Sequence, residues 1–140
     1  MEKLVWKIRI SVLWIFLAVA TSAAMILFIM GPGVVEDLIA GEMEGMEISA
    51  GILIVFALFW IIPLAMAFLT LVLKDTVNRY SNAILGLFFA VFYLVDISGH
   101  LSRGEGFGGH VIMGIVGIVV ALLIFWHAWK WPKPEPKKES

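Results

Sequence analysis

The sequence predicts an all-α bundle of four transmembrane helices that run up and down, and three observations lead to this prediction. Of the 140 residues, 61% are hydrophobic and only 15% are charged, whereas a soluble domain is about 45–50% apolar and about 25% charged. The mean hydropathy is +1.00. Four apolar segments also reach the roughly 20 residues that a helix needs to cross the hydrocarbon layer. Strands are excluded because an open sheet would leave unpaired backbone groups in lipid.

The predicted spans form a single membrane domain over residues 1–131, and they cover residues 8–30, 48–73, 77–99 and 110–131. The first span has a basic start like that of a signal peptide. Its apolar run is longer than the about 7–15 residues of such a segment, so we expect a retained helix. Pro63 is expected to bend the second span, because proline lacks the N–H that would bond to the carbonyl of Phe59.

The connection after the first span is long enough to hold local structure. Gly31-Pro32-Gly33 ends the span, and residues 34–40 place apolar pairs around an acidic pair, which predicts a short amphipathic helix on the membrane surface. Ser49 is suited to cap the second span. The tail, residues 132–140, is rich in proline and charge and is predicted to be a disordered cytoplasmic end.

The charge distribution predicts the orientation. Lysine and arginine exceed acids before the first span, between the second and third, and after the fourth. The first connection instead carries acids alone. Because basic residues accumulate on the cytoplasmic side, we expect both termini in the cytoplasm and a multi-pass protein of the cell membrane. The first and third connections would face outward.

Polar groups gather between the third and fourth spans, in the stretch 96-DISGHLSRGEGFGGH-110. Asp96 and His100 share a helix face, and the glycine-rich link can bring His110 near His100. One interpretation is a metal site made by Asp96, His100 and His110, with Glu105 as a further candidate, because imidazole and carboxylate suit zinc or another transition ion. Haem ligation by His100 and His110 is a second. The sequence favours a third, in which His100 lies within hydrogen-bonding or water-bridged reach of Asp96 and His110 completes no metal site.

Other polar and aromatic residues within the spans receive structural interpretations. Asn78 and Asn82 lie four apart, so both amides are expected to join neighbouring helices. Trp60 lies near the middle of its span and is expected to pack or to face lipid. His127 lies about 25 Å from His110 along one helix at 1.5 Å per residue, so it is not expected to join the polar cluster.

Three stretches resemble a known family. They are 31-GPGVVEDLIAGEMEG-45 with the following Ile48-Ser49, 62-IPLAMAFLTLVLKDTVNRYSN-82, and 126-WHAWKW-131. They look like small four-span prokaryotic membrane proteins that are catalogued only as a domain of unknown function. The resemblance covers nearly the whole chain and implies a bacterial or archaeal membrane protein, but it implies no activity and no functional residues. The architecture is also similar to DoxX-like four-helix proteins, without a shared motif.

The sequence therefore favours a small integral membrane protein that is not an enzyme and acts as a structural or accessory partner. Its expected partners are the lipid bilayer and either further copies of itself or a larger membrane complex, and not nucleic acid. The absence of cysteine excludes disulfides and thiolate sites. Two alternatives stay open: a small oligomeric transporter or ion-handling protein that uses Asp96 and the outer-face histidines, and a redox module that binds a divalent metal or haem. Apart from these, no cofactor is predicted.

Overall fold

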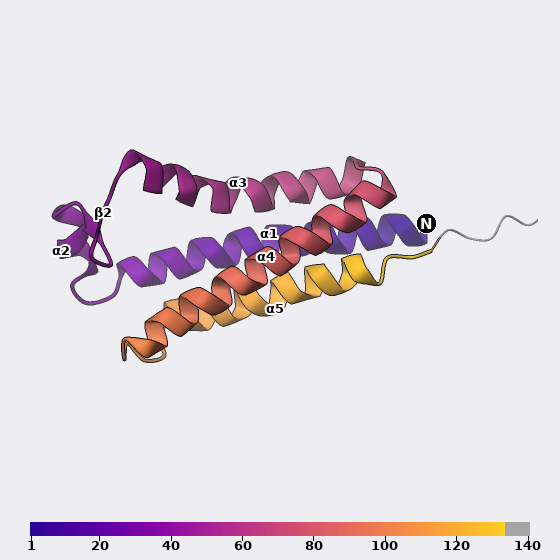
Figure 1. Ribbon diagram of the computed structural model, residues 1–140. Coiled ribbons are helices and arrows are strands. Elements are labelled where there is room, and N and C mark those ends of the chain that lie inside the picture. Colours follow the sequence, from indigo (N-terminus) through magenta and orange to yellow (C-terminus); the bar gives the residue numbers. More distant parts are fainter. Residues whose placement is uncertain (134–140) are drawn as a thin grey trace, which may run out of the picture.

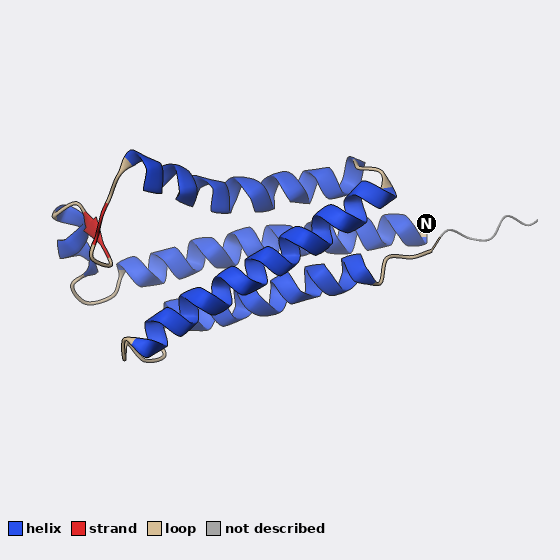
Figure 2. Ribbon diagram, in the orientation of Figure 1, coloured by secondary structure: helices blue, strands red, loops and turns tan. Residues whose placement is uncertain are grey.

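The computed structural model describes residues 1–133 and contains helices and one short hairpin (Figure 1, Figure 2). The elements are α1 (Glu2–Ile29), α2 (Val34–Ile39), β1 (Glu42–Met43), β2 (Met46–Glu47), α3 (Ala50–Val72), α4 (Asp75–Ser102) and α5 (Gly109–Trp129). The all-α prediction is confirmed. The helices α1, α3, α4 and α5 are long and apolar enough to cross a membrane, with mean hydropathies between 1.8 and 2.8 in their most apolar windows. The predicted tail lies outside the described residues from position 134 onward.

The four long helices surround one core, but they do not close into a full ring. The helix α4 packs along α5, α5 packs on α1, and α1 packs on α3, whereas the backbones of α3 and α4 approach each other at few positions. Figure 1 shows α3 and α4 leaving their short connection together and diverging toward the opposite end of the molecule. An open seam therefore runs between these two consecutive helices.

The two ends of the bundle have different partners. At the end with the α3–α4 connection, Lys3 of α1 pairs with Asp75 of α4 at 2.7 Å. At the opposite end, which we call the hairpin end, Arg103 after α4 pairs with Glu44 between the two strands, also at 2.7 Å. The hairpin therefore covers the end of the bundle where α4 turns into α5.

The helix ends differ from the predicted spans. The helix α1 already begins at Glu2, and α4 runs from Asp75 to Ser102, whereas the apolar runs cover residues 8–30 and 77–99. Polar and charged residues continue each helix beyond its apolar stretch. Outside the apolar layer a helix needs only its backbone hydrogen bonds and no apolar surface. This extension places His100 within the last turn of α4.

The connection between α1 and α3 contains the predicted short helix and a hairpin that was not predicted. The helix α2 spans Val34–Ile39, and Ser49 caps α3 by accepting a hydrogen bond from the N–H of Ile52 at 3.3 Å. The strands pair Glu42 with Glu47 and Met43 with Met46. Glu44 and Gly45 form the turn with φ of 51° and 77°, as a two-residue hairpin loop with positive φ at both positions requires.

A buried polar network lies near the connection end. Asn82 of α4 accepts hydrogen bonds from Trp14 of α1 at 2.6 Å and from Thr70 of α3 at 3.2 Å. Its amide donates to the carbonyl oxygen of Asn78 at 2.7 Å, and the Asn78 amide donates to the carbonyl of Thr70 at 2.6 Å. The prediction that these two amides join neighbouring helices is confirmed. The network fastens α3 to α4 at the closed end of the seam.

Candidate functional site

A cavity of about 150 Å³ lies in the seam between α3 and α4, toward the hairpin end. Helix α1 also contributes to the lining, as do Met43 and Glu44 of the hairpin and His110 and Gly114 of α5. We call this space the seam cavity. Its lining residues are Thr21, Ala24, Met25, Phe28, Met43, Glu44, Phe56, Phe59, Trp60, Phe92, Tyr93, Asp96, His100, His110 and Gly114.

Aromatic rings dominate the walls of the seam cavity. The Phe59 ring of α3 lies 4.2 Å from the Phe92 ring of α4 between centroids, so these two side chains bridge the seam. Trp60 lines the cavity and donates its indole N–H to Ser22 Oγ of α1 at 2.8 Å. Trp60 therefore packs against α1, as expected, and also lines the cavity.

Two carboxylates and two imidazoles line the hairpin end of the cavity. His100 is buried, and its Nε2 lies 3.5 Å from Glu44 Oε1 and 3.8 Å from Asp96 Oδ1. The predicted approach of His100 to Asp96 is therefore confirmed within ion-pair distance. Within residues 1–133, no lysine or arginine lines this cavity or forms an ion pair with Asp96. The lining thus carries more negative than positive charge.

The opposite nitrogen of His100 faces the turn between α4 and α5. His100 Nδ1 forms a hydrogen bond with Glu105 Oε2, while Arg103 Nε donates to Glu105 Oε1 at 2.5 Å. These bonds, first that from Arg103 and then that from His100, hold the pKa of Glu105 below its usual value. The stability that they contribute is therefore present above the unfolded-state pKa and is lost as the pH falls through the lowered pKa.

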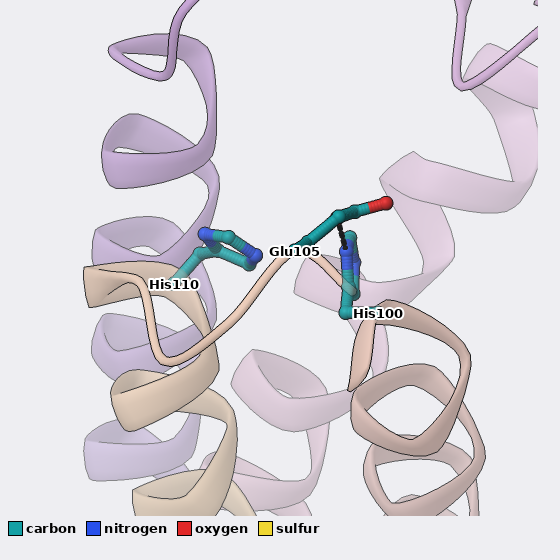
Figure 3. Close-up of side chains that lie close together, drawn as sticks. All are labelled: His100, Glu105 and His110. Atoms are coloured by element: carbon teal, nitrogen blue, oxygen red, sulfur yellow. Dashed lines mark hydrogen bonds and ion pairs between the residues drawn. The ribbon is translucent and has the colours of Figure 1, made fainter. Parts of the chain in front are cut away.

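His110 enters the cluster from the start of α5. Its ring centroid lies 4.7 Å from that of His100 and 5.8 Å from that of Phe28. Figure 3 shows the His110 ring directed toward Glu105 and His100, across the turn that joins the two helices. Its Nε2 atom is buried and has no hydrogen-bond partner in the part of the chain that the structure describes. The expectation that the glycine-rich link brings the two histidines together is confirmed.

Sequence reasoning identified the histidines and missed Glu44. This residue pairs with Arg103 across 59 positions of sequence, and its place depends on the two-residue turn of the hairpin. A glycine directly after Glu44, between Met43 and Met46, was the one available signal for a turn here. His127 lies at the other end of the bundle, where its carbonyl accepts the indole N–H of Trp6 at 2.7 Å. The prediction that His127 stays outside the cluster is confirmed.

A family model described as a family of unknown function, DUF6326, matches residues 4–137. No curated protein and no solved structure matches the chain. The match covers nearly all of the sequence, so the predicted resemblance to a domain of unknown function is confirmed. A relation to DoxX-like proteins is not shown. The chain is a member of the DUF6326 family, a family of unknown function.

Proposed function

We propose that this membrane protein is a non-enzymatic binding protein for a compact organic cation that carries a lipophilic tail. The seam cavity is the observation that carries the proposal. It combines aromatic walls with Glu44 and Asp96 at one end, and within the described chain no lysine or arginine lines it. The proposal is closest to the predicted alternative of an ion-handling protein that uses Asp96.

The chemistry of the lining favours an ammonium group. A cation over an aromatic face is attracted by the ring quadrupole, by about 0.5–1 kcal/mol at exposed sites and by more where water is excluded. The Asp96 carboxylate lies at the end of this aromatic surface. Within the described residues its ion-pair contact is His100 at 3.8 Å, and no lysine or arginine competes with a ligand cation for it.

The size and position of the seam cavity define the rest of the ligand. A dry cavity of roughly 150 Å³ holds one benzene-sized group, so the charged head has to be compact. At the seam, Phe92 lines the cavity and is partly exposed, and Phe88, one turn away on α4, is exposed and stacks on Phe59 of α3. A lipophilic tail attached to the head would therefore continue along these surfaces among the lipid chains.

The alternative roles from the sequence stay predictions. The accessory function, with a homo-oligomer or a larger membrane complex as partner, concerns surfaces other than the seam cavity. The buried polar network and the seam lie within one chain, so ligand binding as proposed here needs no second subunit. A monomeric protein in lipid would be sufficient for it.

A matched pair of ligands tests the proposal. Trimethylphenylammonium and tert-butylbenzene have the same shape and differ in charge. With the protein in lipid nanodiscs, and with empty nanodiscs to correct for partitioning, we expect saturable binding of one trimethylphenylammonium per chain. The neutral compound should bind about tenfold more weakly, which corresponds to roughly 1.4 kcal/mol. Tryptophan fluorescence reports binding, and Trp60→Phe identifies the part of the signal that comes from the cavity. Equal affinity for the two compounds would show that the seam cavity binds ligands through apolar contacts alone, without selecting the charge.

A further inference from the structure

We infer that His100, Glu105 and His110 form a binding site for a divalent transition metal ion, with zinc as the best match. The site lies beside the seam cavity, at the turn between α4 and α5, and the inference does not depend on an organic ligand. Imidazole nitrogens and a carboxylate oxygen are donors that zinc prefers. We call these three residues the histidine triad.

The triad brings one donor atom from each residue into a small volume. The three donor atoms all lie within 4.8 Å of one another. Ligands on a tetrahedral zinc ion, at about 2.0–2.1 Å from the metal, are separated by roughly 3.3–3.5 Å. His100 Nδ1 and Glu105 Oε2 share a hydrogen bond, so a metal bound by both would replace that bond and move the two atoms apart. Rotation of the ring of His110, the half-buried member of the triad, would bring its nitrogen to the same ion.

The second observation concerns His110 itself. Its Nε2 is buried and has no hydrogen-bond partner among residues 1–133, and such an unpaired group costs free energy. In Figure 3 its ring faces Glu105 and His100. A metal ion shared with those two residues would give this nitrogen the partner that the protein does not provide.

The residues around the triad are arranged to orient its donors. Arg103 Nε holds Glu105 Oε1 at 2.5 Å, which leaves Oε2 to face the histidines. The Nε2 of His100 faces Glu44 at 3.5 Å and Asp96 at 3.8 Å. When a carboxylate accepts the N–H of a ligating histidine, it fixes the tautomer and raises the basicity of the donor nitrogen. A metal at His100 Nδ1 would therefore replace the bond to Glu105, while carboxylates lie behind the other ring nitrogen.

The charge around the triad also suits a dication. Three carboxylates, those of Glu44, Asp96 and Glu105, surround His100, and one guanidinium, that of Arg103, opposes them. Arg103 Nη2 lies 3.1 Å from His100 Nδ1, so it has to withdraw when a metal binds there. The Arg103 side chain is 49% exposed, so it has room to withdraw toward solvent when a metal binds.

The set of metal ligands inferred from the structure differs in one residue from the set predicted from the sequence. The sequence combined Asp96 with His100 and His110 and considered Glu105 as an addition. In the structure Glu105 directly contacts Nδ1 of His100, whereas Asp96 faces Nε2 on the opposite edge of the ring. Asp96 therefore becomes a positioning residue, and Glu105 takes the place of the ligand.

The test uses the full-length protein in detergent, with no polyhistidine tag, after removal of metal with a chelator. Zinc affinity is measured by competition with a chromophoric chelator, and stoichiometry by elemental analysis. We expect one zinc per chain. Cobalt(II) should give the visible absorption of a four-coordinate nitrogen and oxygen site. Glu105→Gln and His110→Ala should each weaken zinc binding by at least about tenfold, since even loss of an orienting residue costs about 10–100-fold.

Matched controls separate the triad from general surface binding. His127→Ala removes the histidine at the opposite end of the bundle, and Glu36→Gln removes an exposed acid of α2. Both should retain wild-type zinc affinity. The inference is overturned when wild-type protein binds less than one zinc per chain at micromolar concentration. It is also overturned when either Glu105→Gln or His110→Ala binds zinc as the controls do. The assay contains no organic cation, so its result is separate from that of the proposed cavity ligand.

Discussion

Asn82 holds three helices together through one side chain inside an apolar bundle. It is fully buried, and it accepts hydrogen bonds from Trp14 of α1 and Thr70 of α3 while donating to Asn78 of its own helix. No water is present in the bilayer core to satisfy an amide, so each of these groups depends on the others. The spacing of the two asparagines predicted an interhelical role. It did not predict the tryptophan and threonine partners, which come from other helices.

Replacement of Asn82 by alanine should destabilise the protein. The change leaves the Trp14 N–H and the Thr70 hydroxyl without their acceptor and the Asn78 side-chain oxygen without its donor, and an unsatisfied buried group costs about 1–3 kcal/mol. SDS-induced unfolding followed by circular dichroism gives the change in the free energy of unfolding. Ile84→Ala on the same helix, at a side chain that is 66% exposed, is the control and should have little effect. Equal stability of the two variants would show that the network does not hold the helices together.

The residues of the candidate site were predictable to different degrees. Asp96 and His100 form a local pair, because residues four apart always share a helix face. His110 was predictable from the short link, which limits how far two antiparallel helices can separate. Glu44 was not predictable, because it reaches His100 from a hairpin turn that is distant in sequence. Local spacing thus identified the cluster, and tertiary structure decided which acid contacts which nitrogen.

Among the elements, α4 and α5 make the closest approach. A Cβ atom on Gly86 would lie 2.9 Å from the backbone N of Phe125 and 3.1 Å from the carbonyl O of Ala121. A stripe of small residues therefore allows the two backbones to touch, as in other membrane helix pairs. These contacts also fix the position of α5 relative to α4 along the helix axes, and with it the position of His110.

Gly86→Ala should push α4 and α5 apart and destabilise the protein by about 1–3 kcal/mol, the usual range for overpacking. Gly51→Ala is the matched control, because its added Cβ meets only Ser49 Oγ, at an ordinary 3.7 Å. Alanine there should be neutral or stabilise the helix by up to about 1 kcal/mol. Both variants are compared by SDS-induced unfolding. A Gly86→Ala protein as stable as Gly51→Ala would mean that the helices are not packed this closely.

The elements between α1 and α3 show where sequence reasoning succeeds and where it stops. The helix α2 was predictable because apolar pairs around an acidic pair have a helical pattern. The hairpin was not, because two-residue strands carry too few positions for an alternating pattern to appear. Its consequence for the site is large, since it places Glu44 at one end of the seam cavity.

For the whole molecule, the sequence predicted the number of long helices and their alternating direction. It did not predict which helices are neighbours. Every long helix is apolar around most of its surface, so no single stripe indicates the partner face. The weak contact between α3 and α4, and with it the seam cavity, became visible only in the folded structure.

The orientation in the membrane is a prediction that labelling can test. The chain has no cysteine, so a single introduced cysteine gives an unambiguous signal. In intact cells, Glu36→Cys at the hairpin end should react with an impermeant thiol reagent. Lys74→Cys at the connection end should react only after the cells are opened, because basic connections stay in the cytoplasm. The reverse pattern would place the histidine triad and the hairpin end of the seam cavity on the cytoplasmic side.

Asp96→Asn is the direct test of whether the Asp96 carboxylate makes the seam cavity select a cation. This change removes the charge and keeps the shape. We measure the affinities of trimethylphenylammonium and tert-butylbenzene for wild-type and Asp96→Asn protein in nanodiscs. We expect the variant to lose about tenfold in affinity for the cation, roughly 1.4 kcal/mol, and to bind the neutral compound as the wild type does. An unchanged affinity for the cation, or an equal loss for both compounds, would show that Asp96 does not select the charge.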